Sequence, residues 1–344
     1  MTDSKRHITH TVLFITLGIA TLLLAVGNIF IGTTHLSLGD MWAVLTGGGD
    51  DVARTILLDL RLPKVITATA VGAALAASGL LMQTLFRNPL AGPYVLGINA
   101  GASLGVALFT MALPLLGIAS GGIFSRLGIT GMAWLGSAAI LLLMMLLSRR
   151  IKNINVILII GMMLSAGISA AVGILQYMGD EASLKSFVVW TMGSLTTITR
   201  DDLNILIPTV IVGLMLSIVA IKSLNMLLLG EGYARTMGLR IRLSRTIIFV
   251  ATTLLAGTVT AFCGPIGFIG LAMPHLARMT FRTADHRVLM PATMLWGALA
   301  MLLSCLTTDV VARSSGIMLP INCITSLLGI PIIIIVVLRN RNHQ

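Results

Sequence analysis

Apolar residues in this chain gather into long stretches separated by short polar connections. A helix of about 20 residues is long enough to cross the roughly 30 Å hydrocarbon core of a bilayer. Ten stretches of about this length can be counted. They cover residues 11–32, 64–84, 94–116, 127–148, 154–177, 204–221, 244–262, 267–281, 288–307 and 320–338. The pattern predicts an all-α integral membrane protein with ten transmembrane helices.

The form of the apolar runs argues against a β-barrel. Barrel strands alternate apolar and polar residues, whereas Ile140–Leu147 and Ile330–Leu338 do not alternate. Within lipid, each backbone N–H must find its partner inside the protein, and helices achieve this within one segment. The composition agrees, since 56% of the 344 residues are hydrophobic and only 10% are charged. We therefore expect a single transmembrane domain over residues 1–344.

The distribution of cations predicts the orientation. With ten spans both termini lie on one side, and 16 of the 23 Lys and Arg residues then share that side. The positive-inside rule places it in the cytoplasm. Because the cations are scattered over short loops, the formal net charge of +11 reflects topology and does not indicate a nucleic-acid partner. The apolar run 11–32 is too long for a signal-peptide core, so we expect an uncleaved first span.

Two stretches rich in Gly and Pro interrupt the apolar pattern. They are NPLAGPYVLGINAG at Asn88–Gly101 and CGPIGFIGLAMP at Cys263–Pro274. Each follows a span of similar texture, Gly72–Gly79 in one case and Leu254–Phe262 in the other. Such breaks are tolerated at membrane depth only where protein or a water-filled cavity covers the freed backbone. The likeness suggests an inverted repeat of spans 2–5 and 7–10, as is common in transporters.

Small residues recur every four positions in the fifth span. Gly161, Ser165, Ser169 and Gly173 share one face, which a second helix could approach closely. Two interpretations stay open from the residues alone. The face packs inside the protein, or it lies on a symmetry axis and lines a pathway between two copies of the chain.

Residues that would indicate catalysis or ion coupling are sparse. No charged residue falls clearly at the middle of a span, where an ion-driven carrier usually keeps an acid. The chain contains no GxxxxGK[ST] phosphate loop. His275 and His286 have no neighbouring nucleophile or metal-ligand spacing, and the three cysteines form no CxxC pair. Asp59 and Asp309 fit interfacial residues. We therefore expect no enzyme, no catalytic residue and no metal site.

Several motifs in order along the chain resemble those of the FecCD-type permease family. They are RLPK at Arg61–Lys64, GAALAASGLLMQTLFRNPLAGPYVLG at Gly72–Gly97, LGEGYARTMGL at Leu229–Leu239, GPIGFIGLAMPHLAR at Gly264–Arg278 and LPINCITSLLGIPIIIIVVLR at Leu319–Arg339. The family supplies the membrane subunits of type II ABC importers for iron-siderophore complexes, haem and cobalamin. The resemblance covers nearly the whole chain and implies the type II ABC importer permease fold.

The resemblance also implies partners. Family members pair as dimers in the bacterial inner membrane, recruit two copies of a separate cytoplasmic ABC ATPase, and receive cargo from an extracytoplasmic substrate-binding protein. We expect the second permease copy to be this chain or a close relative. No cofactor is expected on this chain, because ATP and Mg²⁺ would bind to the partner ATPase.

In the family, the cytoplasmic loop between spans six and seven forms a short helix that docks into the ATPase. Here that loop is about residues 223–243. Glu231 at the start of the helix suits the positive end of its dipole, and Gly238 suits a left-handed stop. The ATPase-coupling residues expected by this match are Gly230, Glu231, Tyr233, Ala234, Arg235, Met237 and Gly238.

The remaining roles also follow from the motif match. Arg61, Lys64 and Arg313 are expected to hold acidic residues of the binding protein. Lys64 stands where the family motif has a second arginine. An arginine could donate two parallel hydrogen bonds to a carboxylate, whereas a lysine offers a single compact charge. The face formed by Gly161, Ser165, Ser169 and Gly173 is expected to line the translocation pathway and the dimer contact.

The cargo is not specified by the sequence, and two rival functions stay open. An importer of the same architecture could carry a small oxyanion such as molybdate. An ion-coupled secondary carrier acting alone is the rival from another class, and the missing intramembrane acid argues against it. A membrane-embedded enzyme has no catalytic constellation to support it.

Overall fold

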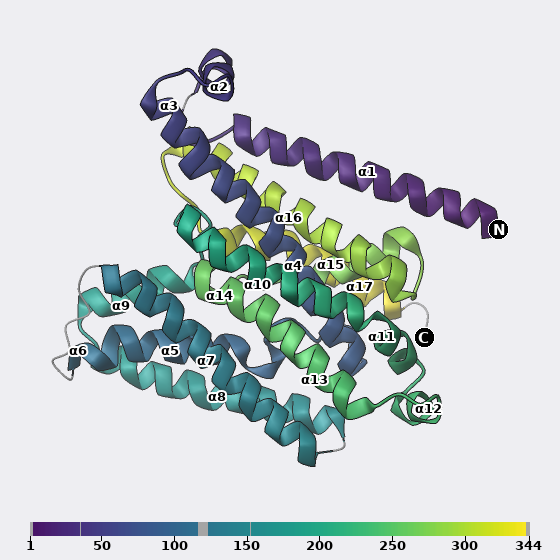
Figure 1. Cartoon of the computed structure of the whole chain (residues 1–344). Coiled ribbons are helices and arrows are strands. Elements are labelled where there is room, and N and C mark those ends of the chain that lie inside the picture. Colours follow the sequence, from purple (N-terminus) through teal and green to yellow (C-terminus); the bar gives the residue numbers. More distant parts are fainter. Residues whose placement is uncertain (1–2, 35, 116–122, 152, 342–344) are drawn as a thin grey trace. The chain divides into compact units, whose positions relative to one another are not determined.

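The structure is a computed structural model that describes residues 3–34, 36–115, 123–151 and 153–341. All regular elements among these residues are helices, which confirms the predicted all-α class (Figure 1). The chain divides into two compact units, and each is described by itself. One unit comprises Met1–Ala76, Ser194–Pro208 and Gly267–Gln344, and the other comprises Ala77–Gly193 and Thr209–Ile266. The predicted organisation as one domain stays a prediction.

Helices of the first unit include the amino- and carboxy-terminal segments of the chain. They are α1 (Asp3–Phe30), α2 (Leu38–Leu45), α3 (Asp51–Thr55), the π-helical η1 (Ile56–Arg61), the first part of α4 (Leu62–Phe86), the first part of α10 (Arg200–Val219), α15 (Ile269–Phe281), α16 (His286–Ser315) and α17 (Ile321–Arg341).

Helices of the second unit lie in the central part of the chain. They are the rest of α4, the 3₁₀ turn η2 (Pro93–Leu96), α5 (Ile98–Ala107), η3 (Leu108–Ala112), α6 (Leu113–Leu115), α7 (Ile123–Arg150), α8 (Ile154–Met178), α9 (Glu181–Thr191), the rest of α10, α11 (Ile221–Leu228), α12 (Glu231–Thr236), α13 (Ile241–Thr252), η4 (Thr253–Gly257) and α14 (Thr258–Cys263).

Among the residues that the structure describes, seven helices are long and apolar enough to cross a membrane. They cover Ile8–Phe30, Asp51–Phe86, Gly128–Arg150, Ile154–Met178, Arg200–Val219, Ile241–Cys263 and His286–Ser315. The other three predicted stretches are also helical, but as the shorter apolar segments Ile98–Ala112 and Ile321–Val336 and the 13-residue helix α15. The count of ten crossings therefore stays a prediction.

Side chains at the amino ends of connecting helices explain where these helices begin. Ser37 and Asp40 form a reciprocal capping box at α2. Asp180 caps α9 by accepting from the backbone N–H groups of Ala182 and Ser183. Hydrogen bonding from Ser183 lowers the pKa of Asp180, because it stabilises the carboxylate form.

In the first unit, α1 lies along α16 (Figure 1). Asn28 donates a hydrogen bond to the carbonyl oxygen of Leu302 at 3.0 Å, which fastens the carboxyl-terminal part of α1 to α16. Leu22 and Leu23 on α1 are 64% and 66% exposed. An exposed apolar surface on a helix of spanning length is suited to contact with lipid.

The tightest helix contact in the first unit depends on glycine. Gly72 on α4 and Gly297 on α16 are so close that a Cβ atom built on either residue would meet the carbonyl oxygen of the other. Small residues let two backbones approach in this way, and the gain is van der Waals contact along both helices. In the second unit, Gly101 on α5 and Gly136 on α7 meet in the same manner.

Both Gly/Pro-rich stretches interrupt helices, as predicted. Gly97 (φ +84°) ends η2, and Gly264 (φ +74°) follows α14. The freed backbone is covered by protein. In the second unit the Tyr94 hydroxyl donates to the Ile266 carbonyl oxygen at 3.0 Å, and in the first unit the Gly267 N–H donates to Asn322 Oδ1 at 2.9 Å. The inverted repeat itself stays a prediction.

Substitution of Gly297 by Ala tests the close contact between α4 and α16. The added methyl group would force the two backbones apart, at a cost of about 1–3 kcal/mol, as for overpacked sites. We expect a lower thermal unfolding midpoint for the detergent-purified protein. Gly27→Ala on α1 is the matched control, because a Cβ there meets no atom within 4 Å. Equal midpoints for the two variants would contradict this packing account.

Candidate functional site

The short helix α12 lies between two glycines, as the sequence predicts. Gly230 precedes it with φ +107°, a conformation that side chains disfavour, and Gly238 follows it with φ +84°. At its end, the Gly238 N–H donates to the Arg235 carbonyl oxygen and the Leu239 N–H donates to that of Ala234. These two bonds form a Schellman motif, which terminates α12 sharply.

The faces of α12 have different environments. Ala234 is fully buried, whereas Tyr233 and Met237 are 58% and 49% exposed. Of the three apolar residues predicted to contact a partner, Ala234 therefore packs inward, and Tyr233 and Met237 form the outer apolar surface. Glu231 and Arg235 share a third face, since residues four positions apart lie on one side of a helix.

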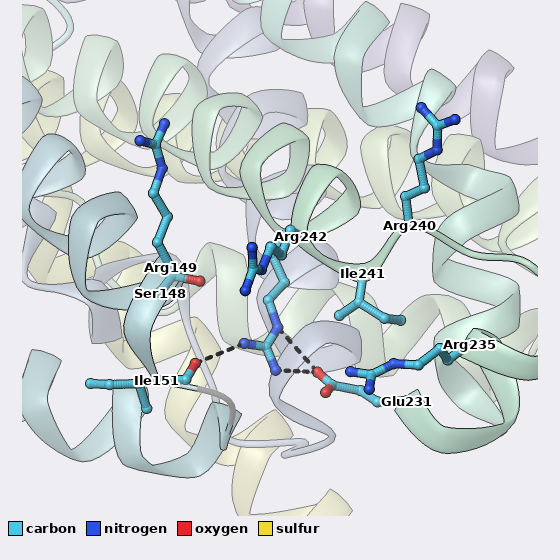
Figure 2. A pocket seen from close by; sticks show the side chains of 9 residues that line it. Ser148, Arg149, Ile151, Glu231, Arg235, Arg240, Ile241 and Arg242 are labelled. Carbon is cyan, nitrogen blue, oxygen red and sulfur yellow. Dashed lines mark hydrogen bonds and ion pairs between the residues drawn. The ribbon is translucent and has the colours of Figure 1, made fainter.

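An ion pair fastens α12 to the start of α13. Arg245 on α13 is only 4% exposed, and its Nη2 and Nε lie 2.6 and 3.1 Å from Glu231 Oε1. The same guanidinium donates through Nη1 to the carbonyl oxygen of Ile151 at 3.3 Å (Figure 2). One side chain thus joins α12, α13 and the connection between α7 and α8.

A second arginine, whose contacts could not be predicted from the sequence, holds the segment directly before α12. Arg87, which follows α4, donates to the carbonyl oxygens of Leu227 and Leu228 at 3.3 and 2.9 Å. These carbonyls end α11, where a cation also opposes the negative end of the helix dipole. A Cβ at Gly230 would lie 3.0 Å from Arg87 Nη2, so glycine leaves room for the guanidinium.

Arginine side chains also surround a cavity of about 370 Å³ beside α12. Figure 2 shows Arg149 and Arg240 at the two sides of this cavity, with Arg242 between them. The lining residues are Ser148, Arg149, Ile151, Glu231, Arg235, Arg240, Ile241, Arg242 and Arg245. All of them belong to the second unit.

Two of the three predicted docking cations are engaged inside the first unit. Arg61 is 6% exposed and donates to the carbonyl oxygens of Ile29, Phe30 and Thr34 at 2.7, 3.2 and 2.6 Å. Lys64 forms an ion pair with the buried carboxylate of Asp309. The docking role of these residues stays a prediction, and for Arg61 it would require giving up bonds to the end of α1.

The buried carboxylate is that of Asp309 on α16. Lys64 Nζ lies 2.5 Å from Asp309 Oδ1, and their side chains are 13% and 5% exposed. Asp309 is thus buried and paired, and its interpretation as an interfacial residue stays a prediction. Asp59, by contrast, is about half exposed and pairs with Arg200 at 2.8 Å. Arg313 is the one predicted docking cation with an exposed position in the structure.

The small residues predicted to form one face of α8 lie in different environments along the helix. Gly161 is buried, and a Cβ there would meet the Val95 carbonyl oxygen of η2. Ser165 is half-buried, whereas Ser169 and Gly173 are exposed. A row of every fourth residue turns by about 40° per step around a helix of 3.6 residues per turn. The buried Gly161 packs inside the protein, and the predicted role of the row at a pathway or dimer contact stays a prediction.

A comparison with protein families places the chain among importers. Residues 19–339 match the model of the FecCD transport family. The chain is 37% identical to the hemin transport system permease protein HmuU of Yersinia pestis, over 95% of each chain. It is 35% identical to the vitamin B12 import system permease protein BtuC of Klebsiella pneumoniae, over 90% of each. It is 34% identical to the molybdate import system permease protein MolB of Haemophilus influenzae, over 92% of each.

A solved structure of an ABC transporter has the same fold as this chain. It is described as an inward-facing conformation of a metal-chelate type ABC transporter, and it superposes with a TM-score of 0.81. The match is 33% identical and covers 95% of this chain and 99% of the other. The predicted permease fold is therefore confirmed.

Substitution of Glu231 by Gln tests how α12 is held. The change keeps the shape of the side chain but leaves the buried Arg245 without its counterion. Hydrogen bonds to charged groups contribute about 1.5–3 kcal/mol, and partial exposure of Glu231 reduces this to about 1 kcal/mol. We expect backbone amides of residues 231–239 to exchange with solvent about fivefold faster. The control is Glu181→Gln at the exposed start of α9, and equal exchange at α12 in both variants would contradict the account.

Proposed function

The chain belongs to the FecCD transport family, and from that premise we propose that it is the membrane permease subunit of an ATP-driven importer. It would pass cargo from an extracytoplasmic binding protein to the cytoplasm, while ATP is hydrolysed on separate ATPase chains. The observation that carries the proposal is α12. This helix exposes an apolar surface of Tyr233 and Met237 and is tied by arginines to neighbouring helices.

The attachment of α12 explains how a force could reach the membrane. A short helix with a fixed start and end moves as a rigid piece, because its terminal glycines set its direction. Displacement of α12 would pull on α13 and on the connection after α7 through Arg245. It would pull on α11 through Gly230 and on the end of α4 through Arg87. Movement of an ATPase could thus become movement of several helices.

We further propose the partners that such a subunit needs. These are two copies of a cytoplasmic ABC ATPase, an extracytoplasmic binding protein and a second permease copy, either this chain or a close relative. The exposed part of the small-residue face, Ser169 and Gly173 on α8, supports a contact or pathway at that end of the helix. For the binding protein, the exposed Arg313 is the best placed of the three docking cations. Rim charges of this kind steer association.

The cargo we propose is a metal chelate, namely an iron-siderophore, haem or corrinoid complex. The relatives named for hemin and vitamin B12 and the metal-chelate type transporter structure support this class. A small oxyanion such as molybdate is the second candidate, because the molybdate permease matches over a similar length. Uptake assays with the cognate binding protein, with haemin, cobalamin, a ferric siderophore and molybdate as competing cargoes, distinguish these classes.

An ion-coupled carrier acting alone is less favoured. Asp309, an acid inside a candidate span, is buried and paired with Lys64. Breaking a buried ion pair leaves an uncompensated buried charge, which is costly, so this pair suits a structural role.

The double substitution of Tyr233 and Met237 by Ala tests the ATPase contact. Removing exposed side chains from α12 should leave the fold intact, and it should weaken a contact built on them. Interface anchors of this size typically cost 1 kcal/mol or more each when truncated, so we expect at least about a tenfold loss of ATPase co-purification and of ATP-driven uptake.

The matched control is Val189→Ala on α9 with Met192→Ala directly after it, which also removes two exposed apolar side chains but outside α12. Normal co-purification and uptake in the α12 variant, or equal losses in both variants, would refute the coupling role.

A further inference from the structure

The cavity beside α12 contains more positive charge than the surrounding residues neutralise. Five of its nine lining residues are arginines and one, Glu231, is acidic. The carboxylate of Glu231 is already paired with Arg245. Within the part of the chain that the structure describes, the other four arginines, Arg149, Arg235, Arg240 and Arg242, form no ion pair.

These four cations come from three different segments that border one space, and all four residues are exposed. Arg149 ends α7, Arg235 lies on α12, and Arg240 and Arg242 lie at the start of α13. Like charges that border one space repel one another, and an anion bound between them would offset this repulsion. The volume of about 370 Å³ is within the usual range of small-ligand sites.

The cavity lies at the ends of two candidate membrane spans, so lipid headgroups are a nearby source of anions. Two candidate membrane spans, Gly128–Arg150 and Ile241–Cys263, each have one end at the cavity. The ends of spans lie at the level of lipid headgroups. On α7, Leu142 and Leu146 are 60% and 51% exposed within the two turns before Arg149. This surface could accept the acyl chains of a lipid whose headgroup entered the cavity.

We propose that the cavity binds a phosphate-bearing anion, and that the anion is the headgroup of an anionic phospholipid. Arginine suits this ligand, because its planar guanidinium donates paired hydrogen bonds to phosphate oxygens. Basic pockets between membrane helices are known to take anionic headgroups. The bound phosphate would offset the repulsion among Arg149, Arg235 and Arg242 and would hold α12 next to α7. This inference does not depend on the proposed transport function.

An acidic side chain of a protein partner is the competing occupant. It is less favoured because the outer surface of α12 is apolar, with Tyr233 and Met237 exposed and Glu231 and Arg235 on a different face. A partner could therefore contact the outer surface without filling the cavity.

The test uses the full-length purified chain in nanodiscs of phosphatidylcholine, with and without phosphatidylglycerol. Retained lipid is measured by native mass spectrometry, and the thermal unfolding midpoint is measured in parallel. We expect phosphatidylglycerol to be retained and to raise the midpoint. In the double variant Arg149→Gln with Arg242→Gln, each lost charge should weaken binding about fivefold, so retention should fall roughly 25-fold.

The control variant, Lys222→Gln with Arg287→Gln, removes the same number of charges from exposed positions outside the cavity. It should retain phosphatidylglycerol like the unmodified chain. Both variants should unfold at an unchanged midpoint in pure phosphatidylcholine, which shows that the fold is intact. Equal loss of lipid in both variants would overturn the proposal, because it would indicate only a diffuse charge effect.

A second arm distinguishes the source of the phosphate. Inorganic pyrophosphate is added to the chain in pure phosphatidylcholine nanodiscs. Stabilisation that depends on Arg149 and Arg242 would support a site for soluble phosphate, whereas stabilisation by phosphatidylglycerol alone supports the lipid. If neither anion stabilises the chain, and the cavity variant instead loses ATPase co-purification, the cavity serves a protein carboxylate and the proposal is wrong.

Discussion

Carbonyl groups at helix ends have no intrahelical partner, and arginine side chains satisfy several of them in both units of this protein. Arg61 donates to the last turn of α1 and to Thr34 just beyond it. Arg87 donates to the end of α11, and Arg245 donates to the carbonyl group directly after α7. A guanidinium suits these places, because it carries several donors in a fixed geometry and its charge opposes the negative end of the helix dipole. The placement of α1 and of the α11–α12 segment depends on these contacts.

Around α12, such arginine contacts attach the short helix firmly to its neighbours. Arg87 holds the end of α11 and Arg245 holds the start of α12, while Gly230 and Gly238 set the path of the backbone. The apolar surface of the helix is left outside, and the surplus of arginines beside it leaves the cavity positively charged. A helix so attached is suited to pass a displacement from a partner to several membrane helices. Because the arginine-lined cavity lies beside α12, an anion bound there could influence how far α12 moves.

Local features of the site could be predicted from sequence, because glycine and proline restrict the backbone wherever they occur. The bounds of α12 and both helix interruptions followed from such residues. Contacts between distant residues could not be predicted. The partners of Arg61 lie about 30 residues away in sequence and that of Lys64 lies 245 away, so the sequence did not reveal these internal contacts of two predicted docking cations. The different environments along the row on α8 were not predicted either, since a period of four drifts around the helix. The all-α class followed from hydropathy and is confirmed, whereas the number of crossings stays a prediction.

Transport by the purified chain in lipid vesicles tests the central claim most directly. The chain is reconstituted with its ATPase and binding protein, and cargo accumulation is measured with ATP or with an imposed proton or sodium gradient. The account predicts accumulation that requires ATP, the ATPase and an intact α12, and none with an ion gradient alone. Accumulation driven by a gradient in vesicles that contain only this chain and no nucleotide would contradict it.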